Sequence, residues 1–422
     1  MRRRIIALAL AATLAVGGGA AYAWESRLTD EDVPFVGYPT AQEVSSWQLM
    51  RGQYERSAER GESVAPVFGS SELNPGPAGF SHPGNLLAPG TYDVGALMAG
   101  RAGCADLWQA IEIGAFASVA DAPRRVVLFP SIQWFMTYRR PARDFPDVYS
   151  SGAFEAFMAN GDISDGLKRR VAQRAAEYGA GESANEGPVE RIVRDVDEAA
   201  KTLASDVRLA HDMAVDGRGS GVAGDATAPL PPRTTSGPDW DAVFTEADRA
   251  ARAQATGNDL GMNDAWYGKH FKTWLEGANK SWKVRGDEYF SSQEFEDFKM
   301  VLDVCRETGV EPLIVIQPVK GAAYDQTVYT CEVRQQYYRM VRDAAADAGF
   351  QVADFSGHEY DRYFLRDYSH PSELGSAYYS KAIYTFLKTG YADTGPSGDV
   401  LLACLSARGR ANGRVMGSKD WV

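Results

Sequence analysis

The sequence has few of the residues that build metal centres and disulfide frameworks. Its 422 residues include five histidines and four cysteines, Cys104, Cys305, Cys331 and Cys404. The cysteines form no CxxC pair and no Cys/His cluster with the spacing of metal ligands. We therefore expect no metal site and no cofactor. An oxidising compartment would permit up to two disulfides in three connectivities, and buried free thiols are the alternative.

The sequence also lacks an excess of positive charge. Lys and Arg total 44 against 56 Asp and Glu, a formal net charge of −12. No general basic field is present to attract nucleic acid or an anionic membrane surface, so we expect no nucleic-acid partner. An anionic polymer would have to be bound through local contacts. With 45% hydrophobic residues, the chain is not disordered as a whole and has enough apolar surface for a sizeable core.

Long apolar runs are lacking except at the N-terminus. Met1-Arg2-Arg3-Arg4 is followed by an uncharged apolar run at residues 5–24, about the length of a membrane-spanning helix. The arginines should stay in the cytoplasm and direct the rest of the chain outward. Ala21-Tyr22-Ala23 offers the alternative of a cleaved secretory signal. We favour a single-pass anchor in the cell membrane at 1–24 and a linker helix at 25–62, with the working part outside the cytoplasm.

Short apolar segments alternate with helical patterns through most of the remaining chain. The expected strands are uniformly apolar, as in strands that are buried on both faces. They lie at 64–68, 125–130, 312–316 and 350–354, and the helices at 41–60, 107–117, 292–308, 332–348 and after Pro371. Ser372 is the expected N-cap of the last helix. This order predicts an α/β domain with a parallel sheet at 63–390, followed by a C-terminal tail at 391–422.

The character of the sequence changes between about residues 139 and 267. Charged, alanine-rich helical segments lead into residues 217–238, a stretch rich in Gly, Pro, Thr and Ser that cannot form a packed core. We interpret 139–267 as a helical insertion that forms a solvated surface bundle. A lid over the functional site is the alternative.

Two distant stretches carry residues suited to nucleophilic catalysis. Val67-Phe68-Gly69-Ser70-Ser71-Glu72-Leu73 places hydroxyls just beyond a strand end, and Asp367-Tyr368-Ser369-His370 places a carboxylate near an imidazole. Serine needs an imidazole to take its proton and a carboxylate to hold that imidazole in the right tautomer. Among the five histidines, only His370 has an Asp three residues before it and a helix start directly after it. The pattern therefore predicts a serine hydrolase or acyltransferase.

Other polar clusters follow the expected strands. Gly69-Ser70-Ser71, Ser131-Ile132-Gln133 and Gln317-Pro318-Val319 each come after a strand end. Ligands of open α/β sheets bind at the carboxyl ends of strands, so these clusters are expected to face one crevice. The amides of Asn258 and Asn263 are further candidates for an oxyanion hole.

Taken in order, five motifs resemble the DltD family, the D-alanyl transfer proteins of teichoic acid D-alanylation. They are Gly69-Ser70-Ser71-Glu72-Leu73, Gly100-Arg101-Ala102-Gly103, Pro130-Ser131-Ile132-Gln133-Trp134-Phe135, Gln317-Pro318-Val319-Lys320-Gly321 with Tyr324-Asp325, and Asp367-Tyr368-Ser369-His370. The resemblance implies a variant of the SGNH (GDSL-like) hydrolase fold, a three-layer α/β fold, tethered by one N-terminal transmembrane helix.

The resemblance implies a role for each motif residue. Aligning Gly-Ser-Ser-Glu with the Gly-Asp-Ser-Leu block makes Ser71 the nucleophile and puts Ser70 where that block has Asp. His370 would be the general base and then acid, and Asp367 the carboxylate that orients it.

It also implies the surroundings of the nucleophile. The backbone N–H groups of Ser71 and Gly103, with the side-chain amide of Gln133, would form the oxyanion hole. His82 and Trp134 would line the acceptor groove.

The implied reaction is transfer of a D-alanyl group through a Ser71 ester to a hydroxyl of teichoic acid or a related cell-wall polymer. The implied partners are a membrane-bound O-acyltransferase and a small acyl carrier protein on the cytoplasmic side. Two alternatives are open: an exported SGNH esterase or O-acetyltransferase acting on another polysaccharide, and a catalytically silent scaffold of a wall-modifying complex.

Overall fold

The computed structural model describes residues 39, 41–59, 63–76, 79–119, 122–139, 141–180 and 237–393. The expected membrane anchor at 1–24, the Gly/Pro-rich part of the insertion and nearly all of the tail at 391–422 lie outside this range. Within it, every helix is too short or too polar to cross a bilayer.

The centre of the molecule is a five-stranded sheet in which all the strands run parallel. In the order in which they lie side by side, the strands are β2 (Gly95–Gly100), β1 (Val64–Gly69), β3 (Arg125–Leu128), β4 (Glu311–Ile316) and β5 (Gln351–Asp354). The predicted parallel α/β architecture is confirmed. The sequence did not indicate β2, because Gly-Ala-Leu-Met-Ala-Gly contains no β-branched residue.

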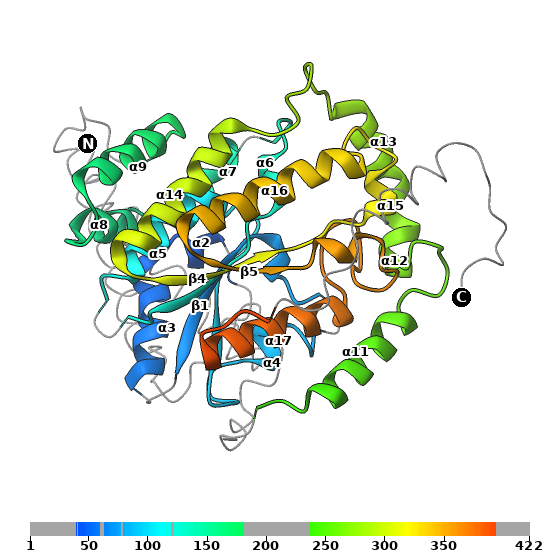
Figure 1. Ribbon diagram of the computed structural model, residues 1–422, viewed down its shortest axis with the longest axis horizontal. Helices are drawn as coiled ribbons and strands as arrows, with labels where there is room; N and C mark the ends of the chain where they lie inside the picture. The colour runs from blue at the N-terminus through cyan, green and yellow to red at the C-terminus, as the bar shows by residue number, and fades with distance from the viewer. Residues whose placement is uncertain are drawn as a thin grey trace, which may run out of the picture.

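Helices cover both faces of the sheet, as Figure 1 shows. Successive residues of a strand point to opposite faces of the sheet and pack into two separate cores: Phe68 packs into one and Val67 into the other. The first core lies under α3 (Trp47–Glu59), α5 (Asp106–Phe116), α14 (Ser292–Thr308) and α16 (Cys331–Ala348); the second lies under α4 (Pro83–Leu86) and α17 (Glu373–Thr389). Burial on both faces explains the uniformly apolar strands.

Most of the predicted helices have the expected ends. Gly309 and Gly349 end α14 and α16 in the left-handed conformation, with φ of +70° and +77°. The side chain of Ser372 caps α17 by accepting from the N–H groups of Leu374 and Gly375. The helix expected at 41–60 is in fact two helices, α2 (Ala41–Val44) and α3.

The first part of the expected insertion belongs to the main core. It forms α7 (Pro141–Val148), α8 (Ser151–Ala159) and α9 (Asp165–Glu177), and both α8 and α9 pack against α5. Phe145, Phe154 and Phe157 are buried in the same core as the sheet. The surface-bundle interpretation is therefore wrong for these helices, because their apolar faces complete one layer of the domain.

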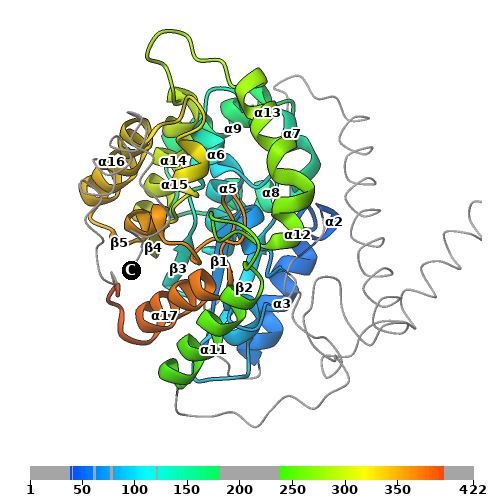
Figure 2. The same cartoon turned by 90° about the vertical axis from the view of Figure 1, so that its right-hand side faces the viewer.

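The second part of that region lies at the other end of the molecule. It comprises α11 (Trp240–Ala253), which packs along α17, and α12 (Asp264–Trp266). Beyond the expected boundary at 267, the chain continues as a π-helical turn at Tyr267–Phe271 and α13 (Lys272–Ser281). Figure 2 views this end directly. Short elements follow the carboxyl ends of four strands: the 3-10 turn Ser71–Leu73 after β1, α6 (Ile132–Phe135) after β3, α15 (Gly321–Tyr324) after β4 and the 3-10 turn Ser356–Tyr360 after β5.

The cysteines divide into two kinds. Cys104 and Cys305 are buried free thiols, and Cys331 is disulfide-bonded. Cys404 lies outside the described residues. Of the possibilities left open by the sequence, a disulfide that uses Cys104 or Cys305 is excluded.

Candidate active site

A tight turn at the carboxyl end of β1 presents the candidate nucleophile. The strand ends at Gly69, and the backbone N–H of Ser70 donates to Glu72 Oε1 at 2.5 Å. A Cβ atom at Gly69 would lie 2.7 Å from that oxygen, so only glycine leaves room for the carboxyl group to close the turn. Ser70 is buried and its hydroxyl has no partner among the described residues, whereas Ser71 is partly exposed.

Ser71, His370 and Asp367 form one hydrogen-bonded chain. Ser71 Oγ lies 2.9 Å from His370 Nε2, and His370 Nδ1 lies 2.9 Å and 3.0 Å from the two oxygens of Asp367. A serine hydroxyl that donates to one imidazole nitrogen, while the other nitrogen donates to a carboxylate, is the arrangement that activates serine. These contacts also distinguish the two adjacent serines, because it is Ser71 that reaches the imidazole.

The turn that carries His370 is built around the Asp367 carboxylate. Asp367 Oδ1 accepts hydrogen bonds from the backbone N–H groups of Ser369 at 2.9 Å and His370 at 2.8 Å, and a bridge between Leu365 and Pro371 closes the turn. Burial raises the pKa of Asp367, but the neighbouring His370 and these donors outweigh burial and leave the pKa below its usual value. Asp367 is therefore held as the ionised partner of His370.

A second carboxyl group lies behind the nucleophile. Glu72 is buried, and burial raises its pKa above the usual value despite the hydrogen bond from Ser70 and the nearby His370. Gln317, just beyond β4, also hydrogen-bonds to the Glu72 side chain. The polar clusters after β1 and β4 thus meet at one edge of the sheet, as expected from the sequence.

The loop after β2 lies next to the nucleophile turn. Gly100 pairs with Gly69 at the ends of the two strands, and a Cβ at Gly100 would lie 2.1 Å from the Gly69 carbonyl oxygen. Three residues further on, Gly103 has a φ of +107° and packs against Val148 of α7. The candidate oxyanion donor Gly103 therefore follows a strand that neighbours β1.

The segment after β3, the other neighbour of β1, carries Gln133 and Trp134. Both are largely buried, with 7% and 8% of their surface exposed. Gln133 Oε1 accepts from Arg139 Nη2 at 3.4 Å, and the Arg139 guanidinium lies over the Trp134 ring at 5.5 Å. The contact with Arg139 fixes the orientation of the Gln133 amide, so its oxygen faces Arg139.

Three expected site residues have structural roles. His82 is buried as the N-cap of α4, where its Nδ1 accepts from the N–H of Gly84; burial lowers its pKa to about 3. It offers no surface to an acceptor, and its expected place in the groove is wrong. The Asn258 amide bonds to Met262 and Asp264, and Asn263 Oδ1 caps α12, so neither of these side chains is an oxyanion donor.

Sequence reasoning missed the aromatic side chains beside His370. Tyr368 lies 6.0 Å from the His370 ring and stacks on Trp274 of α13 at 4.9 Å, and Trp266 of α12 is 5.6 Å from Tyr368. The backbone N–H of Asn263 donates to the Arg366 carbonyl at 2.7 Å. The segment from α12 to α13 therefore lies against the turn that carries His370. The two tryptophans in this short segment, Trp266 and Trp274, were the sequence signal that could have indicated this packing.

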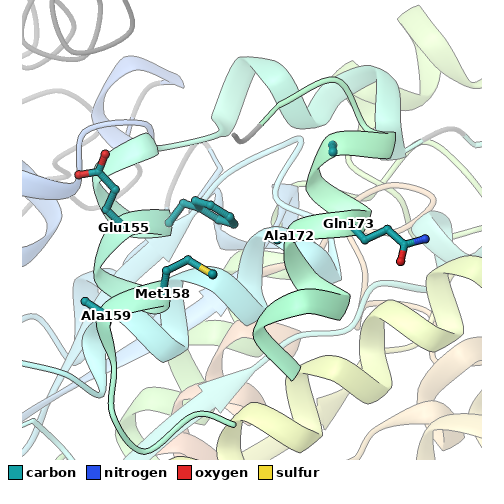
Figure 3. Close-up of a pocket in the computed structure, with 7 residues that line it drawn as sticks. Glu155, Met158, Ala159, Ala172 and Gln173 are labelled. Carbon is teal, nitrogen blue, oxygen red and sulfur yellow. The ribbon is translucent and has the colours of Figure 1, made fainter. Parts of the chain in front are cut away.

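A cavity of about 570 Å³ lies elsewhere, between α8 and α9, and Figure 3 shows its lining. Phe154, Met158, Ala159 and Ala172 make it mainly apolar, and Glu155 is the one ionisable side chain among its described lining residues. Its described lining includes no Ser, Cys or His, so the cavity is separate from the Ser71 and His370 pair. Within the described residues, no group of three or more His, Cys, Asp or Glu side chains is arranged to hold a metal ion.

Comparison with known proteins agrees with the motifs. A family model described as DltD protein matches residues 41–388 of the chain. The chain is 28% identical over 339 residues to Protein DltD of Bacillus subtilis (strain 168), covering 77% of this chain and 82% of that relative. It is 25% identical over 330 residues to Protein DltD of Staphylococcus aureus (strain NCTC 8325 / PS 47), covering 76% of this chain and 81% of that relative.

Proposed function

The chain belongs to the DltD family, and from this premise we propose that it is a membrane-anchored, extracytoplasmic acyltransferase of teichoic acid D-alanylation. It takes a D-alanyl group as a serine ester and passes it to a hydroxyl of teichoic acid or a related cell-wall polymer. The observation that carries the proposal is the contact of 2.9 Å between Ser71 Oγ and His370 Nε2, with Asp367 on the far side of the imidazole.

The parallel sheet with helices on both faces supports an SGNH-like fold for the domain. The nucleophile comes directly after the first strand, and the Asp and His come from a turn just before the last described helix. In this arrangement the strand holds Ser71 in place and the turn brings the base to it.

In the first half-reaction His370 Nε2 takes the proton of Ser71 as Oγ attacks the carbonyl carbon of the donor. Asp367 holds His370 in the required tautomer and stabilises the imidazolium that forms. The oxyanion would be bound by the backbone N–H groups of Ser71 and Gly103 with the amide of Gln133. The carbon's bond to the donor group then breaks, the donor group leaves with the proton from His370, and the D-alanyl ester of Ser71 remains.

In the second half-reaction an acceptor hydroxyl loses its proton to His370 as its oxygen attacks the ester carbonyl. The bond from the carbonyl carbon to Ser71 Oγ breaks, and His370 returns the proton to Ser71. The products are the D-alanyl ester of the acceptor and free enzyme. Reaction with water instead would hydrolyse the ester, so efficient transfer requires a well-bound acceptor.

The family implies how the acyl group arrives. An acyl carrier protein would supply D-alanine on the cytoplasmic side, and a membrane-bound O-acyltransferase would deliver it across the membrane to Ser71. The apolar run at residues 5–24 would hold the catalytic domain near that partner.

Labelling with a fluorophosphonate probe tests the activated serine. We expect the full-length protein in detergent, alone or co-purified with its membrane partner, to be labelled, as should Ser70→Ala. Ser71→Ala and His370→Ala should lose labelling, because the first lacks the nucleophile and the second lacks the base.

Separate, probe-free samples of the preparations that react with the probe then serve for D-alanyl transfer assays, because the probe blocks the serine that it labels. Equal labelling of wild type and Ser71→Ala would rule out Ser71 as the nucleophile. An unlabelled wild type in both preparations, beside a reactive control hydrolase, would point to a catalytically silent scaffold. Turnover of acetyl esters without any D-alanyl transfer would point to an esterase.

A further inference from the structure

Beside the candidate active site lies a guanidinium group that has no carboxylate partner among the described residues. Arg139 follows α6, which begins shortly after β3, the strand next to β1. Its guanidinium lies near the rings of Trp134 at 5.5 Å and Tyr138 at 5.6 Å. Arg139 is part-buried, so solvent and a ligand can still reach it.

The hydrogen-bonding capacity of Arg139 is mostly unused within the described part of the chain. A guanidinium has five N–H donors, and one of those of Arg139 donates to Gln133 Oε1 at 3.4 Å. Its Nε is buried and has no partner among the described residues. The neighbouring hydroxyl of Tyr138 is a further polar contact, but a neutral one.

Two other arginines among the described residues, the buried Arg334 and the part-buried Arg174, are paired with carboxylates. Arg334 binds Glu359 at 2.6 Å and Asp325 at 2.9 Å, and Arg174 binds Asp297 at 2.6 Å. Removing a charge from water without a partner of opposite charge is unfavourable. Arg139 bears part of this cost in the free protein, and an anionic ligand would offset it.

We propose that Arg139, with the aromatic walls of Trp134 and Tyr138, is a subsite for a phosphodiester of the acceptor polymer. This proposal rests on the proposed function and names the part of the acceptor that the enzyme grips. The guanidinium donates through two parallel N–H groups to two phosphate oxygens, a geometry that a planar fork provides and a lysine does not. The hydroxyl next to that phosphodiester is thereby held near the Ser71 ester.

Charge distinguishes this subsite from the site of the acyl group. A D-alanyl group carries an ammonium, which Arg139 would repel, so the guanidinium fits the acceptor rather than the donor. The position of Arg139 agrees with this, because it contacts Gln133, whose segment follows the strand next to the nucleophile's own strand.

The neighbouring surface is also locally basic. Between Asp264 and Arg285 the chain has five Lys or Arg residues, at 269, 272, 280, 283 and 285, and two acidic residues, at 264 and 276, a balance of +3 in a protein of net charge −12. This segment contacts the His370 turn through Trp274 and Tyr368. An anionic chain that approaches the site therefore meets positive charge there despite the acidic protein.

Binding of a small phosphodiester tests the subsite without using the nucleophile. Glycerophosphoglycerol would be titrated into the full-length protein in detergent, with the ³¹P signal as readout. We expect saturable binding that falls about 10- to 100-fold in Arg139→Gln, because charge-assisted hydrogen bonds are lost. Arg139→Lys should recover only part of the affinity.

Arg249→Gln is the matched control, because Arg249 is an exposed arginine that pairs with Glu246 on α11. Its affinity should equal that of wild type, and uncharged diglycerol should not bind. Equal affinity of Arg139→Gln and wild type, or no binding by wild type, would overturn the proposal. A wild-type protein that binds glycerophosphoglycerol through Arg139 but is not labelled by the fluorophosphonate probe would instead overturn the proposed acyl-transfer function and leave the phosphodiester subsite standing.

A lipid headgroup has the same phosphodiester chemistry, and a second arm separates the two sources. The titration would be repeated in nanodiscs of phosphatidylcholine and of phosphatidylglycerol. Equal diester affinity in both supports the polymer as the ligand. A tenfold or greater loss in phosphatidylglycerol, absent in Arg139→Gln, would assign the site to the membrane lipid and overturn the assignment to the acceptor.

Discussion

At the scale of single residues, Asp367 has two tasks that different substitutions separate. Its carboxylate holds His370 Nδ1, and Oδ1 also accepts from two backbone N–H groups of its own turn. Asparagine can keep one oxygen as the acceptor for the turn. It cannot be the anion that the imidazolium needs, and its amide favours the wrong tautomer.

We therefore expect Asp367→Asn to fold with nearly wild-type stability and to lose about 10⁴-fold in acyl-transfer rate, the size of loss typical of an Asp-to-Asn change in a triad. The rate of fluorophosphonate labelling and the midpoint of urea unfolding would be measured on the same preparation. A labelling rate within a few-fold of wild type would mean that Asp367 does not orient His370 for the reaction.

His82 makes the stability of the protein depend on pH. Its folded pKa of about 3 is below the ordinary value of 6.5, because it is buried as a neutral cap of α4. Below pH 6.5 the unfolded chain takes up a proton that the folded protein does not, so the free energy of unfolding falls as the pH drops from about 6.5 toward 3.

His82→Asn should remove part of that dependence, since asparagine also caps helices but does not titrate. Urea unfolding at about pH 7 and about pH 4.5, on either side of the ordinary histidine pKa, would measure it. We expect the difference between the two pH values to be smaller in His82→Asn than in wild type. An equal difference in both proteins would show that other groups account for the acid sensitivity.

The residues of the candidate triad, whose side chains contact one another, were easier to predict than their surroundings. Ser71, His370 and Asp367 were found because their chemistry depends on residue type and on a short spacing. Asn258 and Asn263 were misassigned because an amide can bind an oxyanion or stabilise a turn equally well. Which of the two it does depends on the hydrogen-bond partner that the fold brings to it, here Asp264 for Asn258 and the Trp266 N–H for Asn263. The surroundings of Arg139 were missed, since the partners of a guanidinium are visible only in three dimensions.

At the scale of elements, the close approach of β1 and β2 fixes the position of the nucleophile turn. Gly100 has a φ of +144° and leaves no room for a Cβ against the Gly69 carbonyl. Alanine there would combine an unfavourable backbone conformation with a clash against backbone that cannot move freely.

Gly100→Ala should therefore lower the free energy of unfolding by about 2–4 kcal/mol. Gly277→Ala is the control: Gly277 lies within α13, and a Cβ there would have no described atom within 4 Å, so alanine should raise stability by about 0.5–1 kcal/mol. Urea unfolding of both variants gives the comparison. A neutral Gly100→Ala would mean that the strand ends separate readily.

Elements with a strong local signal were predicted well, and those that depend on packing were not. The helix α14 was predicted with the ends that it has, because Ser291 caps one end and Gly309 terminates the other. β2 was missed, and α8 was placed on the surface, because alanine and glycine are compatible with several environments. Phe154 and Phe157 of α8 are buried, which shows that packing in the core determines where this helix lies.

At the scale of the whole molecule, net charge and local charge have opposite signs. The chain carries −12, whereas the segment from Asp264 to Arg285 carries +3. Long-range repulsion acts on a polymer before it reaches the site, and its range falls from about 30 Å at 0.01 M salt to about 8 Å at 0.15 M.

We expect the association rate of a long teichoic acid chain to rise with salt over this range, as the repulsion is screened. The affinity of glycerophosphoglycerol should fall over the same range, because a short diester senses mainly Arg139. Stopped-flow association and ³¹P titration would measure the two. A polymer association rate that falls with salt would show that the basic segment dominates the encounter.

The two halves of the hydrogen-bonded pair Ser71 and His370 are 299 positions apart in the chain. Ribosomes make the serine first and the histidine near the end of synthesis, so an incomplete polypeptide has a hydroxyl with no base to activate it. A chain that ends before His370 would therefore lack the base of the proposed mechanism. Under that mechanism, Ser71 becomes reactive only after synthesis has passed His370 and the turn that carries His370 has folded against the end of β1.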